Sequence, residues 1–137
     1  MEKENTHTFL GRKPGESGWI EVGLKDLSDM QAFVEGYIER IEIGCGIDLW
    51  VNDSFLAHAA SDTLSLMIKR EDAKLQTVYG NVFVATSNDE GDIVPLSKDQ
   101  MKWFTFRFKE IKQLFSDPFL LITDIQSFRK VGELLWQ

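Results

Sequence analysis

Apolar and polar positions follow their clearest pattern between residues 26 and 52, where the period changes from helical to alternating. Apolar residues recur every three or four positions from Leu27 to Val34, which predicts an amphipathic helix. Asp26 is a favourable N-cap, and Gly36 is placed where a left-handed residue would end the helix. We therefore expect a short, well-defined helix here.

The residues that follow predict a β-hairpin. In residues 37–43, Ile41 and Ile43 share one face of the strand, and Arg40 and Glu42 share the other face with Ile38. Residues 44–46, Gly-Cys-Gly, supply a turn, and residues 47–51 return as a second strand.

Other apolar runs predict further strands. Residues 19–24, 78–85 and 119–123 have suitable length and composition, and Gly80 is expected to form a bulge within the second run. Residues 93–96 form a shorter run, which its proline confines to a sheet edge or excludes from pairing.

Helical spacing predicts three further helices. The strongest runs from about Asp99 to Ser116 and opens with a capping box at residues 97–100. A short helix is expected to carry the apolar residues of 64–68, with an exposed connector over 69–76. A last short helix would carry the apolar residues between 128 and 135.

These elements predict an α+β fold, with a single antiparallel or mixed sheet of four to six strands packed by two or three helices. A chain of 137 residues with 43% hydrophobic residues fits one domain with a real core. Residues 1–18 are polar and rich in glycine, so we expect a flexible N-terminal arm there and a single domain over residues 19–137.

The charge is negative and unevenly distributed. The formal net charge is −7, which disfavours direct nucleic-acid binding because such binding relies on Lys and Arg. Residues 1–101 hold 9 Lys or Arg against 18 Asp or Glu, whereas residues 102–137 hold 6 against 4. Ordinary solvated surface would explain this asymmetry, and the alternative is an acidic face that meets a basic partner.

We expect a cytoplasmic protein. The N-terminal residues lack the apolar segment of a signal peptide, and no run of about 18 apolar residues exists to span a membrane. Cys45 is the only cysteine, which excludes an internal disulfide and fits a reducing compartment.

Four short motifs occur in a distinctive order: Val34-Glu35-Gly36-Tyr37-Ile38-Glu39, Val51-Asn52, Gly80-Asn81-Val82-Phe83-Val84 and Leu96-Ser97. Over about residues 19–105 this order resembles a small uncharacterised family found in bacteria, phages and conjugative elements. That family commonly has two glycines before the tyrosine, and Glu35 takes the place of the first. The resemblance implies a small α+β domain of mobile or accessory genes, and it brings no established activity and no catalytic residues.

Residue chemistry gives few candidates for catalysis or metal binding. His7 and His58 lack the partners that a base or a metal ligand needs, and Cys45 lacks a neighbouring cation to activate its thiol. The Asp and Asn residues at 48–53 and 88–92 are read as turns rather than metal sites. We therefore predict no catalytic residue, no metal and no cofactor.

Three functional hypotheses follow. The first is a non-enzymatic binding or regulatory protein of a bacterial mobile element, acting through protein contacts. The second is an acidic anti-defence inhibitor of a nucleic-acid-binding enzyme. The third is a small-ligand domain or enzyme with a site near Tyr37, Asn52 and Asn81. Trp136, near the end of the chain, is a candidate anchor for a protein partner or for a homodimer through the C-terminal segment.

Overall fold

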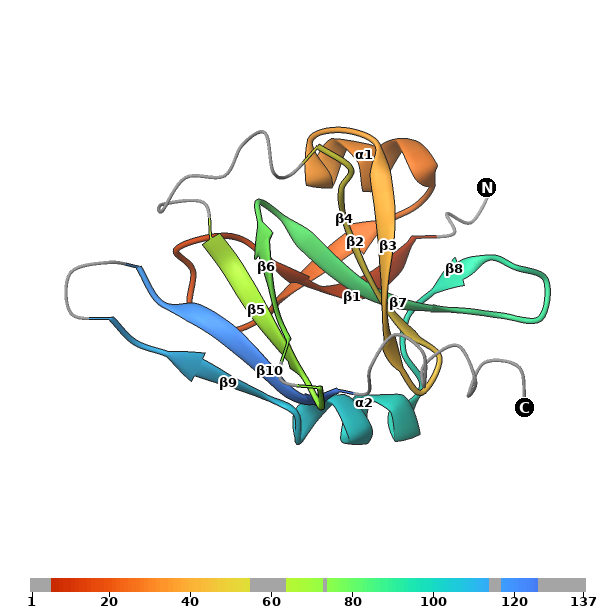
Figure 1. Ribbon diagram of the computed structural model, residues 1–137. Coiled ribbons are helices and arrows are strands. Elements are labelled where there is room, and N and C mark those ends of the chain that lie inside the picture. The colour runs from red at the N-terminus through yellow and green to blue at the C-terminus, as the bar shows by residue number, and fades with distance from the viewer. Residues whose placement is uncertain (1–5, 55–63, 73, 114–116, 126–137) are drawn as a thin grey trace.

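The computed structural model describes residues 6–54, 64–72, 74–113 and 117–125 (Figure 1). Within these residues the elements are, in chain order, β1 (His7–Arg12), β2 (Ile20–Leu24), α1 (Leu27–Val34), β3 (Ile38–Gly44), β4 (Ile47–Asn52), β5 (Leu64–Arg70), β6 (Leu75–Tyr79), β7 (Val82–Ser87), β8 (Ile93–Val94), α2 (Lys98–Thr105), β9 (Phe108–Ile111) and β10 (Phe119–Ile125).

The strands form two sheets, so the α+β class is confirmed and the prediction of a single sheet is wrong. The first sheet has six strands in the order β2-β1-β7-β4-β3, with β8 paired to β7, and all its pairs are antiparallel. The second has the order β6-β5-β10-β9, and its β5–β10 pair is parallel. Gly80, with a φ of 82°, lies between β6 and β7, where the chain passes from one sheet to the other. The run 78–85 is therefore two strands rather than one.

The core has two parts, one on each face of the six-stranded sheet. The larger cluster joins Leu49 and Val51 of β4 to apolar residues of the four-stranded sheet such as Ile68 and Leu120. The smaller cluster lies on the other face, where Met30 and Val34 of α1 pack with phenylalanines of β1 and β7. Each fully buried side chain of this size contributes roughly 1.5–3 kcal/mol to stability. α1 therefore covers one face of the six-stranded sheet (Figure 1).

The predicted helix and hairpin at residues 26–52 are confirmed. The Asp26 side chain accepts a hydrogen bond from the Asp29 amide at 3.0 Å, as an N-cap should. The left-handed residue at the end of α1 is Glu35, with a φ of 65°, and not Gly36 as expected. The β3–β4 turn contains Cys45 and Gly46, both with positive φ.

The predicted flexible arm over residues 1–18 is wrong for residues 7–12, because these form β1 inside the six-stranded sheet, between β2 and β7. Gly11 makes this packing possible, since a Cβ there would lie 2.4 Å from a methyl group of Val22. The following residue, Arg12, is completely buried. A buried arginine beside a glycine has no apolar periodicity, so the sequence pattern does not reveal the strand.

The predicted helix over residues 64–68 is also wrong. This segment lies in β5, where Leu66 and Ile68 are buried at a spacing of two. Residues 69–76 are correspondingly no simple connector, because β5 continues to Arg70 and β6 begins at Leu75.

The long helix predicted from Asp99 to Ser116 is shorter than expected. The capping box is confirmed, because the Ser97 hydroxyl and the Gln100 side chain each accept the other residue's backbone N–H. However, α2 ends at Thr105, and the chain continues as β9 against β10. The Phe108 ring still packs on Phe104, with ring centres 5.1 Å apart, but it does so from a strand.

The remaining strand predictions are confirmed by β2, β8 and β10. The helix predicted between residues 128 and 135 lies outside the described residues. In the part of the chain that the structure describes, no helix has the length and apolar character to cross a bilayer.

Candidate functional site

Two of the predicted binding residues meet at the C-terminal end of α1. The amide nitrogen of Asn52 donates to the carbonyl oxygens of Val34 and Glu35, at 3.1 and 2.9 Å. The amide nitrogen of Asn81 donates to the carbonyl oxygen of Phe33 at 2.8 Å. These carbonyls are among the last of α1, which lack partners within the helix. Both asparagines therefore fasten the end of α1 to the sheet.

Other contacts strengthen this structural role of Asn52. Its side-chain oxygen accepts the Ser54 amide at 2.7 Å, so both ends of the side-chain amide are occupied. A Cβ at residue 36 would lie 2.5 Å from the Asn52 nitrogen, which explains the glycine there. Tyr37 follows with 71% of its surface exposed. Trp136, the fourth predicted binding residue, lies outside the described residues.

The histidines, the cysteine and the acidic turn that the sequence singles out give no metal cluster among the described residues. His7 begins β1 and Cys45 is exposed in the β3–β4 turn, whereas His58 lies outside the described residues. In the turn at residues 88–92 the Asn88 oxygen accepts the amides of Glu90 and Asp92, both at 2.9 Å. Among the described residues, no group of three His, Cys, Asp or Glu side chains is placed to hold a metal ion.

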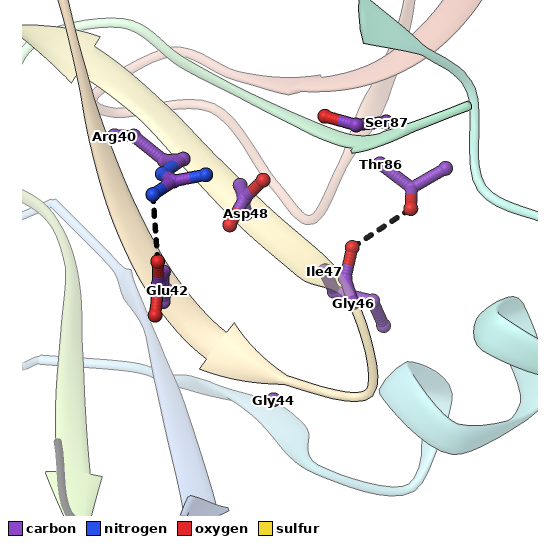
Figure 2. Close-up of a pocket in the computed structure, with 8 residues that line it drawn as sticks. All are labelled: Arg40, Glu42, Gly44, Gly46, Ile47, Asp48, Thr86 and Ser87. Atoms are coloured by element: carbon purple, nitrogen blue, oxygen red, sulfur yellow. Dashed lines mark hydrogen bonds and ion pairs between the residues drawn. The ribbon is translucent and has the colours of Figure 1, made fainter. Parts of the chain in front are cut away.

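A small polar recess does open on the outer face of the six-stranded sheet, away from the larger core (Figure 2). We call it the Asp48 recess. Its lining residues are Arg40, Glu42, Gly44, Gly46, Ile47, Asp48, Thr86 and Ser87. They come from β3, β4, β7 and the β3–β4 turn, and the volume is about 160 Å³.

A bulge in the β3–β4 hairpin determines which side chains line the recess. The register shifts between Glu42 and Gly44, so Glu42 rather than Ile43 pairs with Asp48. Residues directly opposite on paired strands point to the same face. Arg40, two residues before Glu42 in β3, lies on that face as well and forms an ion pair with Glu42 at 2.7 Å.

α2 holds the turn end of the recess. The Gln100 side chain donates to the carbonyl oxygen of Cys45 at 2.9 Å and to the Thr86 hydroxyl at 3.0 Å. Thr86 in turn donates to the carbonyl oxygen of Gly46 at 2.7 Å (Figure 2). These contacts hold the turn against β7, so the recess is braced by hydrogen bonds.

Asp48 is the unusual group in this recess. It is 7% exposed, and within the described residues its carboxylate makes no hydrogen bond and no ion pair. Burial raises the pKa of Asp48 to about 6, and nearby Arg40 opposes this effect while Glu42 adds to it. The recess therefore holds the carboxylate of a mostly buried residue, which shares the charge of Arg40 with Glu42.

The pattern of apolar and polar positions does not reveal this recess, because its lining depends on the register of the hairpin. A hairpin without a bulge would place Asp48 opposite Ile43, on the face that packs against the other sheet. The acidic residue at an otherwise apolar position of 47–51 was the available signal. Only the observed register brings Asp48, Glu42 and Arg40 together.

The negative charge is concentrated in the residues that form one of the two sheets. Residues 6–54 and 82–97 build the six-stranded sheet and α1, and we call them the acidic half. They contain four Lys or Arg against twelve Asp or Glu, a net charge of −8. The other described residues form the four-stranded sheet and α2. They contain eight Lys or Arg against six Asp or Glu, a net charge of +2. The Asp48 recess lies in the acidic half.

Comparison with known proteins identifies the family but no activity. The family described as Domain of unknown function (DUF3846) matches residues 9–109, which is most of the chain. The chain therefore belongs to this family. No curated protein and no solved structure matches the chain.

Proposed function

We propose that this member of the DUF3846 family is a non-enzymatic binding or regulatory protein that docks a basic protein partner on its acidic half. The observation that carries this proposal is the segregation of charge, with −8 on the six-stranded sheet and α1 and +2 on the remainder. A surface dominated by one sign of charge attracts and orients a partner of the opposite sign.

The resemblance to proteins of phages and conjugative elements gives the proposal a setting. In a bacterial mobile element, such a protein would act on a host or element protein that carries a basic surface. Nucleic-acid-binding enzymes are one such class, because they contact phosphates through Lys and Arg. An acidic inhibitor of such an enzyme is therefore the sharper form of the same proposal.

The test is capture from host lysate with matched charge variants. One variant neutralises three exposed acids of the acidic half, E21Q/E35Q/E90Q. The matched control neutralises three exposed acids elsewhere, E71Q/D99N/D117N. Both change the net charge equally, so a difference between them reports where the partner binds.

We expect the wild type and the control to capture the same basic protein at low salt, and the first variant to capture several-fold less. Raising the salt to about 0.5 M should weaken capture, because the screening length shortens to a few ångströms. Capture that resists salt and is equal for both variants would contradict docking on the acidic half.

The hypothesis of a ligand site near Tyr37, Asn52 and Asn81 can be tested in parallel by thermal shift against nucleotides and metal ions. Concentration-dependent stabilisation by one of these ligands, lost in Tyr37→Ala, would favour that hypothesis over protein docking. The engagement of both asparagine amides with α1 supports the docking proposal instead.

A further inference from the structure

We propose that the Asp48 recess is a binding site for one alkylammonium or guanidinium group, held by the Asp48 carboxylate. The inference deepens the proposed function and rests on it in one respect, because a Lys or Arg side chain of a basic partner would supply the group. A free small amine carries the same chemistry, so the experiment below separates the two sources.

The first support is the contrast between Asp48 and the other buried polar side chains. The structure describes five such side chains, and Arg12, Asn52, Ser65 and Arg70 all make hydrogen bonds within the protein. Asp48 is 7% exposed, as Asn52 is, and receives no hydrogen bond from the described residues. Asp48 lines the recess, and its carboxylate is partly desolvated by the surrounding protein, so a cation from outside the chain would gain by pairing with it.

The second support is the charge balance of the recess. The Arg40 guanidinium lies 2.7 Å from Glu42 and also attracts Asp48, so one cation serves two carboxylates (Figure 2). Half of the Arg40 side chain is exposed to solvent. A cation entering the recess would meet a net charge of −1 from Arg40, Glu42 and Asp48. An anion would face two carboxylates, so the recess selects against it.

The third support is size. A volume of about 160 Å³ corresponds to roughly five water molecules. That space admits the end of a lysine or arginine side chain, whereas pockets for drug-sized ligands measure roughly 300–1,000 Å³. The Thr86 and Ser87 hydroxyls line the same space and offer further oxygen atoms to an N–H donor. A nucleotide or a large cofactor is therefore a poor fit.

The test is an NMR titration of the isotope-labelled full chain with n-butylammonium, using 1-butanol as a neutral probe of similar shape. Asp48→Asn removes the charge at nearly constant volume. Arg40→Gln removes the competing cation. Asp53→Asn removes an exposed carboxylate just beyond β4 and serves as the matched control. Amide shifts in β3, β4 and β7 report binding at the recess.

We expect saturable shifts in these strands for the wild type and for Asp53→Asn, with a dissociation constant in the millimolar range. Asp48→Asn should bind at least tenfold more weakly, and Arg40→Gln several-fold more tightly. 1-Butanol should cause no saturable shift. Equal binding by Asp48→Asn and wild type, or shifts confined to other elements, would overturn the proposal.

A second probe, the blocked peptide acetyl-Gly-Lys-Gly-amide, tests whether the bound group comes from a protein side chain or from a small amine. Binding of the peptide with the same dependence on Asp48 assigns the site to a protein side chain. Binding of n-butylammonium without the peptide assigns it to a small amine. If neither probe binds while charge-dependent capture persists, the proposal for the recess fails and the proposal of docking on the acidic half stands. If the probes bind and charge-dependent capture is absent, the proposed docking function fails alone.

Discussion

The guanidinium of Arg12 donates to the carbonyl oxygen of Ser65 at 3.2 Å, and this buried contact joins strands of different sheets. The same group donates to the carbonyl oxygens of Glu16 and Gly18, and to that of Pro118 at 3.0 Å. Arg70 makes a second link, because it donates from β5 to the carbonyl oxygen of Glu42 in β3 at 3.0 Å. Two buried arginines thus tie the sheets together through backbone oxygens.

We predict that Arg12→Met lowers the free energy of unfolding by about 3 kcal/mol or more. The substitution roughly keeps the volume but leaves the buried carbonyl oxygen of Ser65 and three partly buried carbonyl oxygens without this hydrogen-bond donor. Urea denaturation measures the change, and Lys13→Met, on an exposed neighbour, is the control. A variant within about 0.5 kcal/mol of the wild type would show that the Arg12 contacts are not structural.

The contact between Gly36 and Asn52 predicts coupled mutations. Gly36→Ala should destabilise the protein by about 1–3 kcal/mol, because the new methyl group would lie 2.5 Å from the Asn52 nitrogen. Asn52→Ala should cost about 1–3 kcal/mol by leaving carbonyl oxygens at the end of α1 unpaired. In the double variant the clash disappears, so the two effects should be clearly less than additive. Strict additivity in a double-mutant cycle would refute this contact.

The pKa of Asp48 predicts a pH dependence of stability. Burial raises this pKa from an unfolded value near 3.8 to about 6, so the folded state holds the proton more tightly between these values. The contribution of Asp48 to stability therefore falls as the pH rises from about 4 to about 6, and then stays constant. At pH 7.5, Asp48→Asn should be more stable than the wild type by about 3 kcal/mol, and near pH 4 the difference should vanish.

The stability of Asp48→Asn also serves as a control for the binding test. A variant that is more stable than the wild type yet no longer binds cations cannot have lost binding by unfolding. Denaturation of both proteins across this pH range provides the measurement. A stability difference that stays constant with pH would mean that Asp48 titrates normally in the folded state.

The end of α2 can be tested with two neighbouring phenylalanines. Phe104 is completely buried, whereas Phe106 is 83% exposed just beyond the helix. Phe104→Ala should therefore cost about 3–5 kcal/mol, and Phe106→Ala no more than about 0.5 kcal/mol. Thermal or urea unfolding separates these values. A large loss from Phe106→Ala would instead favour the continuous helix predicted from the sequence.

The sequence predicts those parts of the fold that local chemistry determines. α1 follows from the Asp26 cap, the β3–β4 hairpin from alternation around a glycine turn, and the start of α2 from its capping box. Each of these signals lies within a few residues of the structure it specifies.

The remaining errors arise where distant contacts decide the structure. The spacing of Phe104 and Phe108 fits a helix, but pairing with β10 makes the second residue part of a strand. β1 is stabilised by pairing with β7, more than seventy positions away, which no local pattern can show. The recess depends on a one-residue register shift opposite Asp48. Charge asymmetry was visible in the sequence, but its assignment to one sheet required the strand order.

Zero-length cross-linking of the wild-type chain to its captured partner tests docking on the acidic half most directly. A carbodiimide joins carboxylates to lysines only when they are in ion-pair contact, and mass spectrometry identifies the joined residues. We predict that the carboxylates joined to partner lysines lie in residues 6–54 and 82–97, and that about 0.5 M salt suppresses the links. Links concentrated on carboxylates outside these ranges, such as Glu71, Asp99 and Glu110, would contradict this assignment.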